Sequence, residues 1–236
     1  MVKDGIVWLE SCASTNDEAG SLVKDTSVVA VAATAQTQGR GRAGRAWHSP
    51  PGAGLYLSWI GRPRFPQSLG SVVPLMAAVT VAELCERLGV KVQLKWPNDV
   101  LIGNRKLAGV LCEARGTPRE WTVIIGIGLN IFRPEGGYPD AVPAVALDEY
   151  TREELDPKDL AEELVSRLDA RLTELGRDGG APVIGAWERR GYPRGSTLQR
   201  GDLRGTFAGL TDEGALRLAT ETGIHTIHAG DVDIIE

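Results

Sequence analysis

The segment that most constrains the fold of this chain is a loop at residues 39–50, rich in glycine and arginine. Its glycines follow the spacing G-x-G-x-x-G, and an apolar run of strand length, residues 28–35, lies shortly before them. That spacing is typical of dinucleotide-binding folds, in which the motif opens a helix that holds the pyrophosphate at its N-terminus. No helix fits here, because two prolines and two glycines follow within residues 50–54. We therefore exclude a dinucleotide-binding fold and expect the loop to connect two strands, residues 28–35 and 54–60.

The arginines of this loop, Arg40, Arg42 and Arg45, indicate a site for an anion. A guanidinium group suits phosphate and carboxylate, and glycine lets the backbone approach a ligand closely. A solvated basic turn is the simple alternative, because charged loops rich in glycine are common. Since no helix end is available, arginine side chains would have to hold any phosphate.

Length and composition limit the classes of protein that remain. A chain of 236 residues can form one core with a small appended unit. The formal net charge of −5 argues against a protein built for non-specific binding of nucleic acid. Three widely spaced cysteines form neither a disulfide framework nor a metal-binding pattern, which favours a reducing, cytoplasmic environment. We find no signal peptide in the first 14 residues and no run long enough to span a membrane.

A Ser-Thr-Asn-Asp-Glu run that begins at Ser14 is expected to start the first helix. Ser14 or Thr15 would cap the helix, with Asp17 or Glu18 closing a capping box. Alternatively, the adjacent donors and acceptors of Ser14, Thr15 and Asn16 could hold a polar ring. The two interpretations are compatible, and capping is the simpler one.

Two predicted strands, residues 106–114 and 121–131, carry glycine in their interiors: Gly109 in the first, Gly126 and Gly128 in the second. An interior glycine weakens a strand unless another group has to approach its backbone. We therefore expect a sheet surface that is cleared of side chains and can hold a flat, apolar ligand.

A polar cluster around Lys95, Asn98 and Asp99 follows a predicted strand, residues 90–94. The lysine can contact phosphate, and Asp99 can bind Mg²⁺ or a ribose hydroxyl. The alternative is a turn whose Asn and Asp bond to their own backbone, which gives no reason for the lysine. Lys106, at the mouth of an apolar strand, is either another cation of the site or an ordinary exposed residue.

The rest of the chain predicts helices, a linker and a second small unit. Apolar stripes predict helices at residues 71–88 and 156–176. Residues 187–193 look like a linker, and the short strands beyond them predict a small β-barrel. We therefore expect two domains, residues 1–190 and 191–236.

Five motifs make the chain resemble the biotin protein ligases along nearly its whole length. They are Ser14-Thr15-Asn16, the loop at residues 39–50, the run from Lys95 to Asp99, the run from Lys106 to Gly109, and the run from Gly126 to Asn130. Each motif is weak alone, whereas five in the order and spacing of the family are very specific.

The resemblance implies an α+β fold, in which a mixed β-sheet core flanked by helices, as in biotin/lipoate ligases, carries a small C-terminal SH3-like β-barrel. It implies that biotin and Mg·ATP react to biotinyl-5′-AMP and pyrophosphate. Biotin then passes to a lysine on the biotin carboxyl carrier domain of a carboxylase. The resemblance implies no tightly bound cofactor and no membrane partner, and it implies a homodimer. Some members carry an N-terminal DNA-binding region, for which Ser14 lies too close to Met1, so we expect no nucleic-acid partner.

The resemblance also assigns roles to individual residues. Lys106 and Arg42 would be catalytic, because a carboxylate that attacks a phosphate brings two anions together. The residues expected to bind biotin are Ser14, Thr15, Asn16, Gln36, Arg40, Gly41, Arg42, Lys106, Gly109, Leu111, Gly126 and Gly128. Those expected to bind the nucleotide are Arg42, Arg45, Trp47, Lys95, Asn98, Asp99 and Asn130, with Asp99 as the candidate metal ligand. An aromatic wall for adenine is not evident between residues 131 and 150.

Two other functions remain open. A lipoate ligase or octanoyl transferase is built on a similar core and also modifies a carrier lysine, but the arginine loop and the run from Lys95 to Asp99 favour biotin. A non-enzymatic biotin-binding module would leave Lys106 and Asp99 without a role. We find no Ser, His or Cys nucleophile with catalytic partners, and this chemistry requires none.

Overall fold

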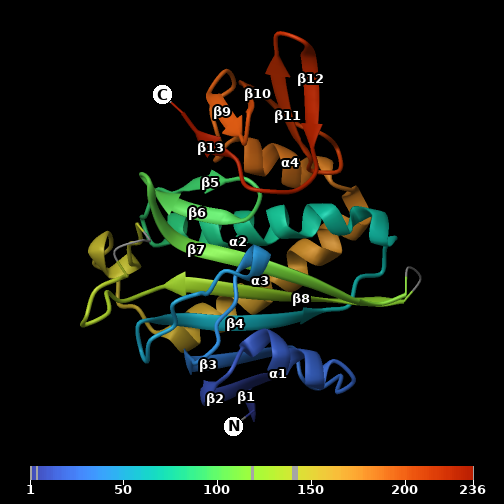
Figure 1. Cartoon of the computed structure of the whole chain (residues 1–236). Coiled ribbons are helices and arrows are strands. Elements are labelled where there is room, and N and C mark those ends of the chain that lie inside the picture. The colour runs from blue at the N-terminus through green and yellow to red at the C-terminus, as the bar shows by residue number, and fades with distance from the viewer. Residues whose placement is uncertain (1, 4, 118–119, 140–142, 236) are drawn as a thin grey trace.

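Two β-sheets organise the computed structural model, which describes residues 2–3, 5–117, 120–139 and 143–235 (Figure 1). The larger sheet has eight strands in the order β1-β2-β3-β4-β8-β7-β6-β5. Their bounds are β1 (Val2–Lys3), β2 (Ile6–Cys12), β3 (Ala30–Gln36), β4 (Gly54–Gly61), β5 (Gln93–Lys95), β6 (Asp99–Ile102), β7 (Arg105–Gly116) and β8 (Trp121–Asn130). Only β2 and β3 pair in parallel; the other neighbours are antiparallel. The sheet is therefore mixed, as predicted.

Alternating side chains give the larger sheet two different faces. On β3, Ala30 and Ala32 belong to the main core, whereas Val31 packs in a small cluster with Ala19 of α1 (Thr15–Leu22). The main-core face is covered by α2 (Val73–Arg87) and α3 (Pro157–Asp178), which lie side by side behind the sheet (Figure 1). The other face, which carries α1, is left open in its middle for the site.

The predicted helix at residues 71–88 forms as α2, preceded by a 3₁₀ segment, η2 (Gln67–Val72). Gly89 ends the helix with φ of +76°, a left-handed conformation that glycine adopts without strain. Together Gln67–Arg87 is long and apolar enough to cross a membrane by length and composition, which corrects our statement that no such run exists. In this structure 67% of its most apolar window is buried, as expected for a core helix.

The predicted linker at residues 187–193 is wrong for its first two residues, whereas residues 189–193 do connect a helix to the second sheet. A fourth helix, α4 (Ala181–Glu188), includes Trp187, whose side chain is fully buried. Its ring meets that of Tyr192 edge to face at 5.8 Å, and Tyr192 in turn meets Phe207 at 5.5 Å. This aromatic cluster is a packed joint between α4 and the second sheet, because three large rings exclude water there.

The smaller sheet has five antiparallel strands in the order β12-β11-β10-β9-β13. Their bounds are β9 (Thr197–Arg200), β10 (Leu203–Leu210), β11 (Leu216–Thr220), β12 (Gly223–Ile227) and β13 (Asp233–Ile234). It lies above the β5 edge of the larger sheet (Figure 1). The predicted small C-terminal β unit is confirmed, but in the described part of the chain no strand pairing closes it into a barrel.

Candidate functional site

A cavity of about 770 Å³ opens on the face of the larger sheet that carries α1. This volume is typical of sites for small molecules and cofactors. The predicted residues that line it are Ser14, Thr15, Asn16, Gln36, Arg40, Gly41, Arg42, Arg45, Trp47, Asn98, Asp99, Lys106, Gly109, Leu111, Gly126, Gly128 and Asn130. Residues up to 116 positions apart are thus gathered around one space, and of the predicted residues only Lys95 lies outside it.

The floor of the cavity is a pair of strands with glycine at the points that face inward. In the register of β7 and β8, Gly109 lies opposite Gly128, and Leu111 lies opposite Gly126. Their neighbours Val110 and Ile127 point the other way, into the main core. The predicted cleared surface therefore exists.

The indole of Trp47 lies on this cleared surface. A Cβ at Gly128 would collide with its ring, and a Cβ at Gly109 would lie 3.1 Å from it. Lys106 Nζ sits 5.3 Å from the centre of the same ring, within the range of a cation–π contact. The glycines therefore make room for one planar group at this position.

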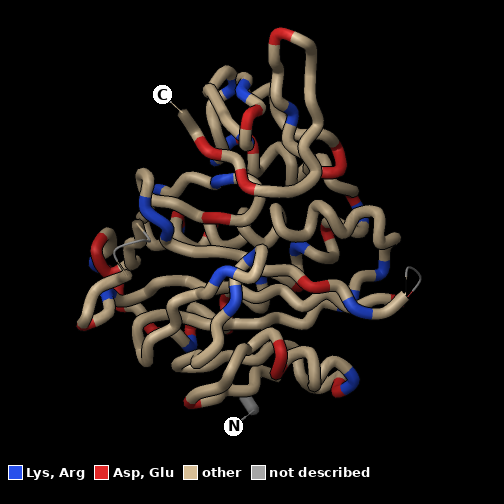
Figure 2. Tube along the Cα trace, in the orientation of Figure 1, with Lys and Arg blue, Asp and Glu red and all other residues tan. Residues whose placement is uncertain are grey.

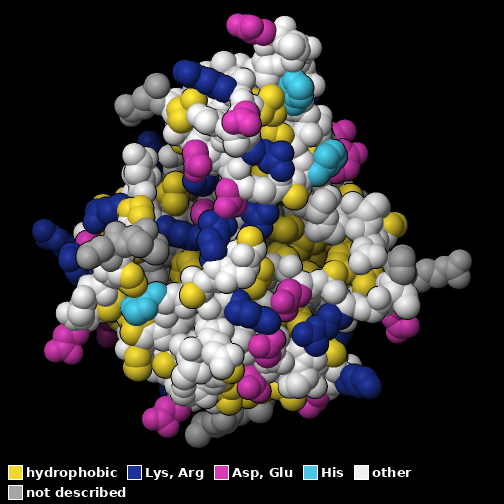
Figure 3. All heavy atoms as spheres, in the orientation of Figure 1, with side chains coloured by type: hydrophobic (Ala, Val, Ile, Leu, Met, Phe, Trp, Pro, Cys, Tyr) yellow, Lys and Arg dark blue, Asp and Glu magenta, His cyan; other side chains and the backbone are white. Residues whose placement is uncertain are grey.

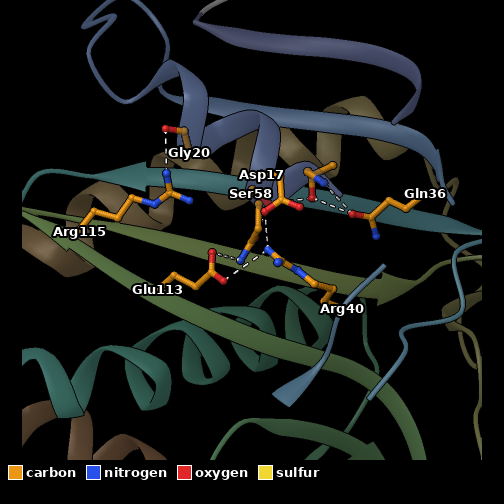
Figure 4. Close-up of polar contacts among 9 residues, drawn as sticks. Asp17, Gly20, Gln36, Arg40, Ser58, Glu113 and Arg115 are labelled. Carbon is orange, nitrogen blue, oxygen red and sulfur yellow. Dashed lines mark hydrogen bonds and ion pairs between the residues drawn. The ribbon is translucent and has the colours of Figure 1, made fainter. Parts of the chain in front are cut away.

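The polar end of the cavity is built around Gln36, at the end of β3 (Figure 4). Its Oε1 accepts hydrogen bonds from the backbone N–H of Thr15, at 2.8 Å, and from the Thr15 hydroxyl, at 3.1 Å. Ser14 is the N-cap residue of α1, but its side chain makes no capping hydrogen bond, so the predicted capping box is wrong. The backbone N–H of Thr15, at the start of the helix, instead donates to the side chain of Gln36 on β3.

The basic end of the cavity holds its cations against carboxylates. Lys106 Nζ lies 2.6 Å from Asp99 Oδ1, and Arg45 Nη2 lies 2.7 Å from Asp231 Oδ2. Arg42 lies 3.6 Å from Asp231 and donates to Asn98 Oδ1 at 3.1 Å. Figure 2 shows basic positions on the loop in front of β7 and β8, below acidic positions of the C-terminal segment. Such partly exposed ion pairs are individually weak, so an incoming anion can exchange for them at little cost.

The turn at Asn98 and Asp99 does not bond to its own backbone, contrary to the simple alternative. Asn98 Nδ2 donates to the carbonyl oxygen of Val110 at 2.6 Å, while its Oδ1 receives Arg42. Asn98 therefore fixes Arg42 against β7, and Asp99 is occupied by Lys106.

Lys95 is placed away from the cavity. It is the last residue of β5, and its Nζ lies 2.6 Å from Asp233 Oδ1 of β13. The position ties the edge of the larger sheet to the C-terminal sheet. Its predicted contact with the nucleotide stays a prediction.

Several residues near the site were not predicted, and Tyr138, Ser58 and Glu113 are among them. Tyr138 lines the cavity from the segment where no aromatic wall was evident, and burial raises the pKa of its phenol to about 12, so the hydroxyl stays protonated. Ser58 is fully buried on β4 and contacts Thr15 and Asn16. Glu113 contacts Asn16 and Arg40. The signals were a serine within an apolar strand and a glutamate in phase with Gly109.

A second, smaller cavity of about 280 Å³ adjoins the first below the C-terminal sheet. Both are lined by Arg42, Asn98, Val110 and Leu111, so they meet along β7. Figure 3 shows apolar side chains recessed there, beside the basic groups at the middle of this face.

Neither a thiol nucleophile nor a metal cluster is evident in the described part of the chain. Burial raises the pKa of Cys12 to about 11 and the pKa values of Cys85 and Cys112 to about 12, so all three remain thiols. No group of three or more His, Cys, Asp or Glu side chains is arranged for a metal among the described residues. With Asp99 held by Lys106, these residues do not fit a metal site of their own, and we derive no step through one.

Comparison with known proteins identifies the family. Residues 10–130, more than half of the chain, match the Biotin/lipoate A/B protein ligase family, and residues 197–234 match the Biotin protein ligase C terminal domain. The chain belongs to the biotin protein ligase family. The Biotin--[acetyl-CoA-carboxylase] ligase of Paracoccus denitrificans is 34% identical to this chain over 236 residues. The match covers 93% of this chain and 96% of the relative. The Bifunctional ligase/repressor BirA of Bacillus subtilis (strain 168) is 32% identical over 239 residues, and the match covers 97% of this chain and 74% of that relative.

Solved structures of biotin protein ligases have the same fold. The Biotin protein ligase from Aquifex aeolicus in complex with biotin and ATP is 28% identical, with a TM-score of 0.80 and 99% of each chain covered. The Biotin Protein Ligase From Leishmania Major in complex with Biotinyl-5-AMP is 25% identical, with a TM-score of 0.67, covering 96% of this chain and 100% of that one. Both predicted parts of the fold, the mixed sheet with its helices and the C-terminal sheet, thus belong to this family.

Proposed function

We propose that this protein activates biotin with ATP and transfers it to a lysine of the biotin carboxyl carrier domain of a carboxylase. One observation carries the proposal: a slot floored by Gly109, Gly126 and Gly128 has polar hydrogen-bonding groups at one end and Lys106 with Arg42 at the other. The Trp47 ring, which lies over Gly109 and Gly128, would have to move aside to admit a ligand there. A bicyclic urea with an acyl chain fits such a slot, its urea at the polar end and its carboxylate at the cations. The named relatives and the biotin-bound and ATP-bound neighbours support the same assignment.

In the first step, an oxygen of the biotin carboxylate would bond to the α-phosphorus of ATP, and the bond from that phosphorus to pyrophosphate would break. Two anions meet in this step, so fixed positive charge lowers the barrier. Lys106 and Arg42 supply that charge, one from β7 and one from the loop. Any Mg²⁺ would arrive with ATP as part of the substrate.

In the second step, the carrier lysine's amine would bond to the acyl carbon, AMP would leave, and the amine would release its proton. A mixed anhydride hydrolyses if water reaches it, so the loop has to cover it. The 3₁₀ turn η1 (Arg42–Gly44) lies in this loop, and Arg45 N–H donates to the Arg42 carbonyl at 3.2 Å. The residue roles assigned from the resemblance, except that of Asp99 as a metal ligand, are part of this proposal, including that of Lys95.

The proposal extends to the wider organisation of the protein. We keep a catalytic unit at residues 1–190 and a C-terminal unit at residues 191–236, a homodimer in a cytoplasmic setting, and no nucleic-acid partner. The net charge of −5 supports the last point. Light scattering tests the dimer, and retardation of its own promoter DNA in a gel would contradict the absence of DNA binding.

The test of the function is the exchange of labelled pyrophosphate into ATP, run with biotin, with lipoate, with octanoate and with no acid. We expect exchange only with biotin, because only biotin offers N–H donors to the polar end of the slot. Exchange with lipoate or octanoate instead would assign the protein to the sister enzymes. Wild-type protein that binds biotin but shows no exchange would be a binding module.

The ion pairs of Asp231 lead to a further prediction. Its carboxylate holds Arg45 at 2.7 Å and Arg42 at 3.6 Å, the guanidinium groups that the proposed function reserves for phosphate. Asp231→Asn removes the competing anion, so we expect the KM for ATP to fall about two- to fivefold, the size of a weak, exposed ion pair. Steady-state exchange kinetics measure it. Asp202→Asn, in the exposed turn between β9 and β10, is the control, and a higher KM in Asp231→Asn would mean that Asp231 holds the arginines in place for phosphate.

A further inference from the structure

A line of hydrogen bonds at the polar end of the cavity joins Ser58 on β4, through Asn16, to Glu113 on β7 (Figure 4). Ser58 Oγ lies 2.6 Å from Asn16 Oδ1, and Asn16 Nδ2 lies 3.3 Å from Glu113 Oε2. Glu113 is on β7, two residues beyond Leu111, so the alternation of the strand puts it on the same face as the cavity floor. Asn16 is therefore held from two sides by residues on β4 and β7.

The carboxylate of Glu113 decides which way round the Asn16 amide lies. A carboxylate only accepts hydrogen bonds, so Glu113 has to receive the NH₂ end. Oδ1 then faces Ser58, whose single hydroxyl proton can go either to it or to Thr15 Oγ1 at 2.8 Å, so Ser58 does not by itself fix the amide. Asn16 is only 4% exposed, so the reversed amide would set its oxygen against the Glu113 carboxylate with little water to compensate.

The same contacts aim the amide oxygen over the floor of the slot. A Cβ at Gly126 would collide with Asn16 Oδ1, so this oxygen lies directly above the glycine. An amide oxygen accepts from two directions, and Ser58 uses one of them. The other is available to an N–H of a bound ligand.

Arg40 is the second partner of Glu113, but the position of Arg40 does not depend on Glu113. Arg40 Nη2 lies 2.6 Å from Asp17 Oδ1 and 3.4 Å from Glu113 Oε1. The shorter ion pair is the one with Asp17. Asp17 bonds to Arg40, whereas the Asn16 amide bonds to Glu113, so the two acids can be separated by mutation.

We propose that Glu113 is a positioning residue that determines specificity: by fixing the Asn16 amide, it makes the polar end of the slot select a ligand with an N–H donor. A urea ring has such donors and a dithiolane or a plain alkyl chain has none. The inference rests on the proposed function, because it takes Asn16 as a contact of the biotin ring. It adds the residue that sets the direction of that contact.

The experiment compares Glu113→Gln with Asp17→Asn in direct biotin titration by calorimetry and in pyrophosphate exchange. The new amide of Glu113→Gln can donate as well as accept, so Asn16 is no longer held in one orientation. We expect biotin affinity to fall about tenfold and kcat to change less than about twofold, as for a lost hydrogen bond to a charged group. Asp17→Asn should stay within about twofold of the wild type in both measurements, since surface ion pairs contribute little.

Biotin methylated at either ring nitrogen supplies a readout that a general loss of structure would not move. One of the two analogues should lack the N–H that bonds to Asn16 Oδ1, so the wild type should bind it less tightly than biotin. Glu113→Gln should lose much less affinity for the same analogue, because in that variant the hydrogen bond to Asn16 is already weakened. Melting temperatures of all three proteins within a few degrees would exclude a folding defect, since the side chain of Glu113 is 32% exposed.

The other outcomes overturn specific parts of the argument. Equal weakening in Glu113→Gln and Asp17→Asn would show that Arg40, not Asn16, carries the effect, and the inference would be wrong. Unchanged affinity in Glu113→Gln, with biotin bound by the wild type, would also overturn it while leaving the proposed function intact. A wild type that binds no biotin would overturn both.

Discussion

Replacing Lys106 with alanine should lower the rate of biotin-dependent pyrophosphate exchange by about a hundred- to a thousandfold, the usual cost of removing one group that stabilises transition-state charge. Lys106 Nζ lies in the cavity between Asp99 and the Trp47 ring, where no other lysine of the predicted site can replace it, because Lys95 points to Asp233. Exchange kinetics at saturating biotin and ATP measure the loss, and calorimetry shows whether biotin still binds.

The structure also explains why this variant should fold. The backbone of Lys106 keeps its contacts, because its N–H donates to Pro143 O and its carbonyl accepts from Val145 N–H. Lys106→Arg preserves the charge and should recover part of the rate, whereas Lys91→Ala, an exposed lysine outside the cavity, should behave as the wild type. An alanine variant within about tenfold of the wild-type rate would exclude Lys106 as a catalytic residue.

Gly126→Val should abolish measurable biotin binding, with at least about a hundredfold loss of affinity, because overpacking and a lost hydrogen bond act together. A Cβ at this position collides with Asn16 Oδ1, and Asn16 cannot retreat while Ser58 and Glu113 hold it. Valine suits a strand, so the sheet itself should form. Biotin titration by calorimetry and a thermal melt separate loss of binding from loss of fold.

A matched control exists for this substitution. Gly136 has no heavy atom within 4 Å of a built Cβ and needs no left-handed backbone, so Gly136→Ala should leave biotin affinity unchanged. Wild-type affinity in Gly126→Val would mean that biotin does not use this part of the floor, which would contradict the proposed orientation of the slot.

Much of the site could be predicted because its residues carry their chemistry in local patterns. Gly126 and Gly128 are two apart on one strand, so they face the same side whatever surrounds them. The arginine loop was recognised because no helix could follow its glycines. The predictions that failed concern contacts with distant parts: the cap of α1 comes from Gln36 on β3, and Trp187 is buried by Tyr192 and Phe207 rather than exposed in a linker.

Sequence alone determined which side chains could take part: the cations of the loop, the glycines of the floor and the polar start of α1. Local spacing decides these features, because strand alternation and helix-breaking residues act over a few positions. Only the tertiary structure decided how the side chains are held. Asn16 and Glu113 are 97 residues apart, yet they share a hydrogen bond, and Asp231 reaches Arg45 from the C-terminal segment. Such pairs depend on strand order and on where the second sheet lies, and no local pattern in the chain encodes either.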